Sequence, residues 1–141
     1  MNRNVLRPNW REFLQTDVKP GRLNMHHQAV RQVVKRDGTT ESYNREKIRS
    51  AIKAAFEAVD APESDERLEL LLQGVEQKLK EFMSTRHPNS APAIEEIQDI
   101  VETVLVEARE TAVAKSYILY RARHEAMRDA RKLLLDINTT M

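Results

Sequence analysis

The segment Val30–Arg49 constrains the fold more than any other, because four structural signals follow one another within it. It begins with β-branched valines at positions 30, 33 and 34, which favour a strand. Asp37-Gly38 then supplies the positive φ that a two-residue hairpin turn requires. A short return strand follows over residues 40–43, and Asn44 stands at the N-cap position of a helix. The predicted order is strand, tight turn, strand, helix.

Cations gather at the predicted start of this helix. Arg45, Lys47 and Arg49 lie in or just past its first turn. Lys35 and Arg36 come from the neighbouring hairpin turn. Because a helix N-terminus already carries partial positive charge, such a cluster is unfavourable unless an anion binds there. Exposed backbone N–H groups make the same place an anion site that a polyphosphate would fit. A solvated basic hairpin that binds nothing is the alternative that these residues leave open.

The composition excludes several kinds of site. The chain has 141 residues, 40% of them hydrophobic, which is enough for one domain with a core. Its formal net charge of +1 lacks the basic excess typical of nucleic-acid-binding proteins. The absence of cysteine excludes disulfides, thiolate zinc sites and a cysteine nucleophile. No apolar run reaches membrane-spanning length and the N-terminus lacks a signal-peptide core, so we expect a cytoplasmic protein that makes no membrane contact.

Apolar residues recur at helical spacing in four segments after the hairpin. The first segment ends before Pro62, and the second begins at the cap Ser64. Pro92 suits the first turn of the third segment. A break over 109–111 leads into the last helix, which runs from about residue 112 into the 130s. We therefore expect an α+β, mostly helical fold, in which a small β-hairpin or sheet packs on about four helices.

Two stretches that lie well apart in the sequence resemble one family. Residues 33–52 are similar to the opening signature of the ATP-cone domain, with the sequence VVKRDGTTESYNREKIRSAI. Residues 96–125 resemble its closing signature, EIQDIVETVLVEARETAVAKSYILYRARHE. The resemblance implies a domain that binds ATP or dATP, with Mg²⁺, and regulates a ribonucleotide reductase. The ending ARKLLLDINTTM resembles the junction that leads into the catalytic barrel of anaerobic, glycyl-radical ribonucleoside-triphosphate reductases.

The resemblance also implies roles for individual residues in the opening signature. Lys35, Arg36 and Lys47 match the family's contacts with the triphosphate. Val33 and Ile48 match the apolar walls against adenine. The phosphate end of the nucleotide would therefore meet the cations that the residue pattern had already brought to the start of the helix.

Other positions of the resemblance surround the rest of the nucleotide. Glu41 and Asn44 stand where family members touch the base or the ribose. Tyr120 and Arg123 match positions that reach the nucleotide from the far side. Two positions on the third helix carry polar residues near the phosphates in other members, and here they are Ile94 and Gln98. An isoleucine cannot hydrogen-bond a phosphate.

We expect the chain to have three parts. Residues 1–29, which show no sustained apolar period, form a flexible N-terminal extension. Residues 30–128 form the ATP-cone domain, and residues 129–141 form a linker toward a missing catalytic domain. The chain has neither a recognisable Ser/His/Asp arrangement nor the glycine-rich Walker pattern, so these residues are expected to sense a nucleotide without hydrolysing it.

The resemblance implies an allosteric domain that controls the overall activity of a ribonucleotide reductase. Its partners would be adenine nucleotides, the reductase catalytic domain and, in a nucleotide-dependent way, a second copy of the chain. Two alternatives stay open. One is an ATP-cone transcriptional regulator of reductase genes, although the family's repressor branch carries a four-cysteine zinc ribbon and this chain has no cysteine. The other is a helical interaction module that binds no ligand.

Overall fold

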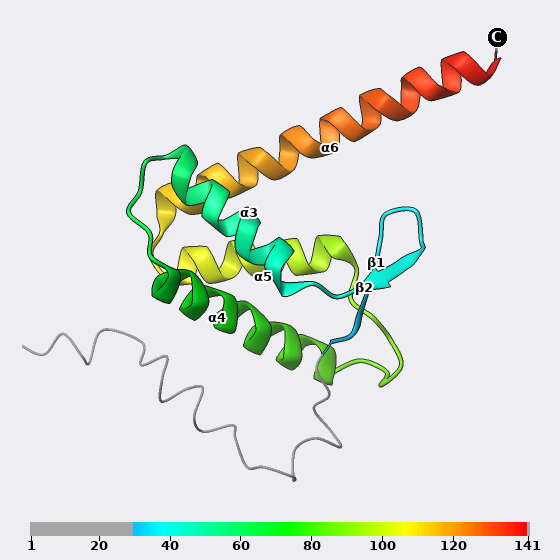
Figure 1. Cartoon of the computed structure of the whole chain (residues 1–141). Helices are drawn as coiled ribbons and strands as arrows, with labels where there is room; N and C mark the ends of the chain where they lie inside the picture. Colours follow the sequence, from blue (N-terminus) through cyan, green and yellow to red (C-terminus); the bar gives the residue numbers. More distant parts are fainter. Residues whose placement is uncertain (1–29, 141) are drawn as a thin grey trace, which may run out of the picture.

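The computed structural model describes residues 30–140, which form a two-stranded sheet and four helices (Figure 1). This is the α+β, mostly helical arrangement expected from the sequence. The N-terminal extension expected over residues 1–29 lies outside the described residues.

A β-hairpin opens the described part. β1 (Gln32–Val34) pairs antiparallel with β2 (Thr40–Ser42). The backbone N–H of Val34 also donates to the carbonyl of Pro92, at 2.9 Å, and Val34 forms a parallel bridge with Ala93. The hairpin is thereby fixed to the segment around Pro92 and Ala93, which lies more than 50 residues further along the chain and leads into the third helix.

The hairpin loop differs from the two-residue turn expected from the sequence. Lys35 accepts a hydrogen bond from the Gly38 N–H at 2.9 Å and donates its own N–H to Thr39 at 2.7 Å. The loop therefore has three residues, 36–38, and within it only Gly38 has positive φ, at 88°. A two-residue type I′ turn would need positive φ at both central residues, whereas a three-residue loop needs it at one. The Asp37 carboxylate stabilises the loop by accepting hydrogen bonds from the Thr39 hydroxyl and N–H, which lower the pKa of Asp37.

Four helices follow the hairpin, in the order that the periodicity predicted. They are α3 (Arg45–Ala58), α4 (Asp65–Ser84), α5 (Ile94–Glu107) and α6 (Thr111–Thr140). Both predicted caps are confirmed. Asn44 accepts from the N–H of Glu46 at 3.0 Å, and Ser64 accepts from the N–H of Arg67 at 3.1 Å. Each side chain satisfies one of the N–H groups that have no partner inside a helix.

The start of α5 differs from that expected, whereas the break after it lies within about a residue of the predicted position. Pro92 lies before the helix and not in its first turn, because Ala93 is the N-cap residue and the Pro92 carbonyl is bound to the hairpin. The Ala93 N–H donates instead to the side chain of Glu96, at 2.9 Å. The break after α5 carries Arg109 at φ 62°. A non-glycine residue takes this left-handed conformation there, which explains why no glycine or proline marks the break in the sequence.

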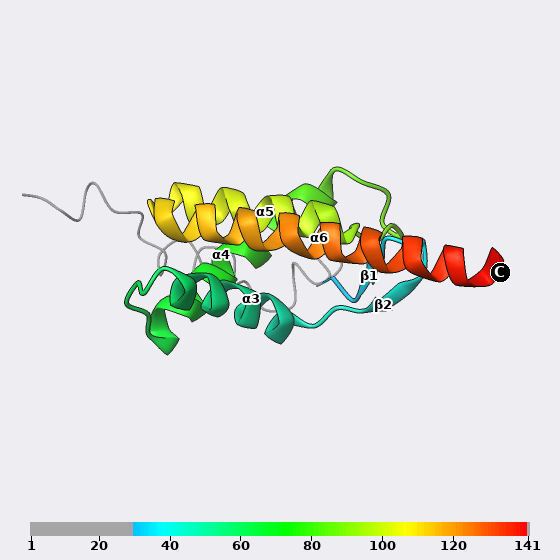
Figure 2. The same cartoon turned by 90° about the horizontal axis from the view of Figure 1, so that it is seen from above.

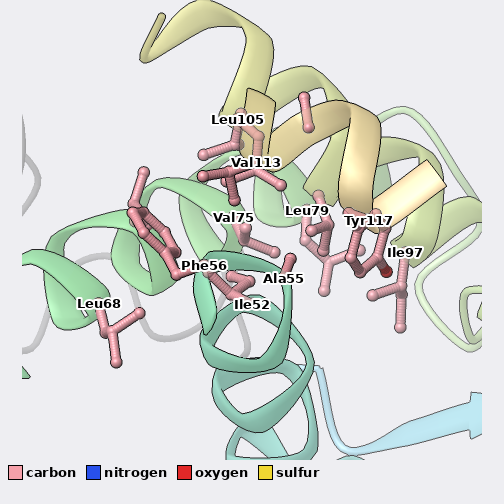
Figure 3. Packing of buried hydrophobic residues seen from close by; sticks show 14 of the residues in the cluster. Ile52, Ala55, Phe56, Leu68, Val75, Leu79, Ile97, Leu105, Val113 and Tyr117 are labelled. Carbon is pink, nitrogen blue, oxygen red and sulfur yellow. The ribbon is translucent and has the colours of Figure 1, made fainter. Parts of the chain in front are cut away.

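The hydrophobic core lies between the four helices (Figure 3). α3 packs against α4 and α6, and α5 packs against α4 and α6. Each helix contributes apolar side chains that are almost completely buried: Ile52, Phe56, Leu68, Leu72, Val75, Leu79, Val101, Val104, Leu105 and Val113. Val33 joins this cluster from the hairpin, so the sheet is anchored to the same core as the helices.

The last helix is longer than the body that it covers. Its first turns pack on α3 and α5, and the rest runs out beyond them (Figures 1 and 2). Every residue over 122–138 is exposed. The expected helix into the 130s is confirmed, and the stretch 129–140 that was expected to be a linker continues the same helix. The division between domain and linker stays a prediction. Among the described residues, none of the helices has the length and apolar content that a membrane span requires.

Candidate nucleotide-binding site

Three of the predicted site residues meet between the hairpin and α3. Val33 and Glu41 are directly paired across the two strands, so their side chains share one face of the hairpin. Val33 is 6% exposed and belongs to the hydrophobic core. Lys47, the third residue of α3, pairs with Glu41 at 3.3 Å. The ion pair ties the start of α3 to β2.

Asn44 and Ile48 lie beside this contact, one at the cap of α3 and the other one turn into it. The Asn44 side-chain oxygen is engaged by the Glu46 N–H, which leaves its amide nitrogen as a donor for a ligand. Ile48 is half-buried and packs against the core. The start of α3 therefore offers an apolar surface and a hydrogen-bond donor within one turn.

The hairpin loop brings the other two predicted cations. Lys35 and Arg36 follow directly after β1 and are exposed. Lys35 makes no ion pair within residues 30–140. Arg36 is paired with Glu95, in the first turn of α5, at 2.9 Å. Glu95 in turn accepts a hydrogen bond at its backbone carbonyl from Arg121 of α6, at 3.3 Å. The loop, the start of α5 and the middle of α6 are thus connected through Glu95.

Arg121 is held firmly in this position. Its guanidinium group also pairs with two carboxylates further along α5, that of Asp99 at 2.8 Å and that of Glu102 at 2.5 Å. Burial disfavours the charge of Arg121, but the hydrogen bonds to the two carboxylates outweigh it and raise the pKa of Arg121. Sequence reasoning missed this residue, although Arg121 lies between the two α6 residues that the resemblance selected.

Those two residues, Tyr120 and Arg123, are exposed on α6. The Tyr120 ring lies against the ring of His124, with 4.1 Å between the centroids. Tyr120 is 37% exposed, whereas Tyr117 is buried in the core. No hydrogen bond, ion pair or ring contact joins Tyr120 or Arg123 to the hairpin within the part of the chain that the structure describes. Their contact with a nucleotide stays a prediction.

Arg45 and Arg49 do not belong to the cation cluster in which the sequence placed them. Arg45 donates to Glu69 at 2.9 Å and to Glu76 at 3.1 Å, both on α4. Arg49 also pairs with Glu69, and Tyr43 donates its hydroxyl to Glu76 at 2.8 Å. We call these five residues the Arg45 network. It fixes the start of α3 to α4 and neutralises two of the five cations.

The electrostatics of the Arg45 network follow from its hydrogen bonds. The bonds to Glu76 and Glu69 raise the pKa of Arg45, and the same contact lowers the pKa of Glu69. Burial, followed by the bond to Glu76, raises the pKa of Tyr43. A signal for the network was present in the sequence, because Glu69 and Glu76 stand seven residues apart and so share one face of α4.

The third helix contributes one unsatisfied polar atom. The side-chain oxygen of Gln98 is buried and has no hydrogen-bond partner within residues 30–140. Ile94, one turn earlier, is half-buried against the core. An unpaired buried acceptor is unfavourable, and a ligand donor would relieve it. The residues described include no group of three or more side chains suited to hold a metal ion by themselves.

Comparison of the sequence with known proteins identifies its family. Residues 31–126 match the ATP cone domain. The chain is 37% identical over 110 residues to a vitamin B12-dependent ribonucleoside-diphosphate reductase of Thermoplasma acidophilum, a match that covers 74% of this chain and 13% of the relative. It is 38% identical over 105 residues to a ribonucleoside-diphosphate reductase subunit alpha of Chlamydia muridarum, covering 70% of this chain and 10% of the relative.

A third relative is an anaerobic ribonucleoside-triphosphate reductase of Haemophilus influenzae, 33% identical over 102 residues, which cover 72% of this chain and 14% of the relative. The chain thus spans between 10% and 14% of the length of these three relatives. The matched region contains the hairpin, α3, α4, α5 and the packed half of α6. The chain belongs to the ATP-cone family.

Proposed function

We propose that this chain binds ATP or dATP between its hairpin and the start of α3, as an allosteric effector of a ribonucleotide reductase. The observation that carries the proposal is the position of Lys35, Arg36 and Lys47. Lys47 lies in the first turn of α3, which Asn44 caps, and Lys35 and Arg36 follow β1 in the hairpin loop; the ATP cone match includes all three. Backbone N–H groups and cations at a helix N-terminus suit a polyphosphate.

The Arg45 network supports this reading. Arg45 and Arg49 each pair with two carboxylates, whereas Arg36 and Lys47 each pair with one and Lys35 makes no ion pair within residues 30–140, so the cations most available to a ligand are those of the loop and Lys47. Lys47 is 68% exposed, and its pairing with Glu41 can be exchanged for a phosphate at low cost. Val33 and Ile48 would lie against adenine. Mg²⁺ would arrive with the phosphates, because Mg²⁺ commonly binds through substrate phosphates and a few carboxylates.

We also propose that the nucleotide acts on a catalytic region outside these residues. The relatives are reductases several times longer than the matched region. In this proposal the chain senses and does not reduce, and α6 leads from the site toward the catalytic region. These relatives favour a reductase over a transcriptional regulator of reductase genes. A cytoplasmic location stays a prediction.

A sensor that distinguishes dATP from ATP must register one ribose hydroxyl. A hydrogen bond to that hydroxyl is worth on the order of 1 kcal/mol, and each tenfold preference takes about 1.4 kcal/mol. The two ligands must also favour different conformations or assemblies, because a ligand with equal affinity for two states shifts neither. We propose nucleotide-dependent self-association as that response.

Titration calorimetry with ATP and Mg²⁺ tests the site. The Lys35→Ala/Lys47→Ala double variant should bind about tenfold more weakly or worse, because two charge-assisted phosphate contacts are lost. A matched control, Lys53→Ala/Lys132→Ala, removes the same charge from exposed positions elsewhere and should bind like the unaltered chain. Undiminished affinity in the first variant would refute the site. Absence of binding by the unaltered chain would favour the ligand-free interaction module.

A further inference from the structure

We propose that Glu95 sets the affinity of the nucleotide site by competing with the phosphates for Arg36. The inference rests on the proposed function, since it concerns the same site. The resemblance assigns no role to Glu95, and the structure makes it the partner of a cation that the site requires.

The ion pair between Arg36 and Glu95 is well formed but open to exchange. Its atoms lie 2.9 Å apart, and the two side chains are 30% and 38% exposed. An exposed pair of this kind is weak, because water screens both charges. Guanidinium groups bind carboxylates and phosphates with similar geometry. A polyphosphate that reaches the loop can therefore replace the carboxylate.

Glu95 itself is held where it is by three features of α5 and α6. It lies in the first turn of α5, where the helix dipole favours an anion. Its backbone carbonyl is bonded by Arg121, which is fixed by two carboxylates of α5. The N–H of Ala93, two residues earlier, is bonded by Glu96. Glu95 thus presents a negative charge to Arg36 from a fixed backbone.

The competition has two consequences for a bound nucleotide. Arg36 must leave Glu95 before it can contact a phosphate, so the pair lowers the net gain from that contact. The Glu95 carboxylate then stays near the phosphates without its cation and repels them. Both effects weaken binding, and both vanish when the charge of Glu95 is removed.

The test is ATP affinity, measured by calorimetry with Mg²⁺ on the full chain. Glu95→Gln should bind ATP about two- to fivefold more tightly than the unaltered chain, the range that the energy of one exposed ion pair corresponds to. Glu96→Gln is the matched control. It removes the same charge one residue away, from a side chain that pairs with Arg86, and glutamine can still bond the Ala93 N–H. The Glu96→Gln variant should bind ATP with the same affinity as the unaltered chain.

Arg36→Ala supplies the second control, because it removes the contested cation. In that background Glu95→Gln should give a smaller gain than in the unaltered chain. Equal gains from Glu95→Gln and Glu96→Gln, or no gain from Glu95→Gln while the unaltered chain binds ATP, would overturn the competition and leave the nucleotide site standing. If the unaltered chain binds no ATP, the proposed function fails, and the competition fails with it.

Discussion

Positively charged residues have different roles at the start of α3, and the role of each depends on its ion-pair partners. Lys47 points to β2, where its pairing with Glu41 is exposed, whereas Arg45 is bonded to two carboxylates of α4. Asn44 and Gly38 could be predicted as a cap and a turn residue, because those roles depend on local geometry. The role of Arg45 could not be predicted with the same ease, since its partners lie 24 and 31 residues away.

Replacing Tyr43 with phenylalanine should isolate one hydrogen bond of the Arg45 network. The change removes the hydroxyl that donates to Glu76 and keeps the ring against the core. We expect the free energy of unfolding to fall by about 1 kcal/mol, the usual worth of such a bond. Denaturant unfolding measures it. Tyr120→Phe is the control, because the Tyr120 hydroxyl makes no hydrogen bond within the described residues. Equal losses in the two variants would contradict the role of the Tyr43 hydroxyl.

At the scale of elements, periodicity predicted the helices better than it predicted their ends. The four helices and the caps of α3 and α4 follow from apolar spacing and from Asn44 and Ser64. The start of α5 did not follow, because the Pro92 carbonyl is taken by the hairpin, a contact between distant segments. The break after α5 lies within about a residue of the predicted 109–111, although Arg109 adopts there a conformation for which glycine is the usual signal.

The contact between α3 and α4 should depend on pH through Glu69. Arg45 holds the pKa of Glu69 below its ordinary value of 4.5. Because the folded-state pKa is lowered, the stabilisation is present above the unfolded-state pKa and is lost as the pH falls through the folded-state pKa. Glu69→Gln should therefore reduce the free energy of unfolding by about 1 kcal/mol at pH 7, discounted for partial exposure of the pair.

The difference between Glu69→Gln and the unaltered chain should shrink as the pH falls from about 6 to about 3, and thermal unfolding across that range measures it. Glu57→Gln, at an exposed position of α3, is the control and should change the stability little at any pH. A difference that stays constant with pH would show that Glu69 stabilises the fold through packing and not through its charge.

At the scale of the whole molecule, the long α6 joins the proposed site to the exposed end of the described chain. Its packed half carries Arg121, which reaches Glu95 and through it Arg36. Its projecting half carries exposed apolar side chains, among them Met127, Leu133 and Leu134. Apolar spacing predicted that this helix would reach the 130s. The sequence did not predict how far the helix projects beyond the body, because that depends on where α3 and α5 end.

ATP and dATP should therefore favour different self-associated states of the chain. A ligand held by the loop and the start of α3 would displace Arg36 from Glu95, and packed helices tend to respond by switching between discrete arrangements. Association amplifies a coupling of about 1–3 kcal/mol into a visible change of mass. Sedimentation velocity with no ligand, with ATP and with dATP, at saturating concentrations, measures the distributions directly.

A variant on α6 makes this last prediction specific to a surface. Leu134 is 62% exposed, and Leu134→Glu should suppress the nucleotide-dependent association while leaving the affinity for ATP unchanged. Lys132→Glu is the control. It introduces the same glutamate side chain, but at a position that points away from residue 134 on the helix. Suppression by both variants would assign the effect to charge. Identical distributions of the unaltered chain in all three conditions would refute nucleotide-dependent self-association of this chain.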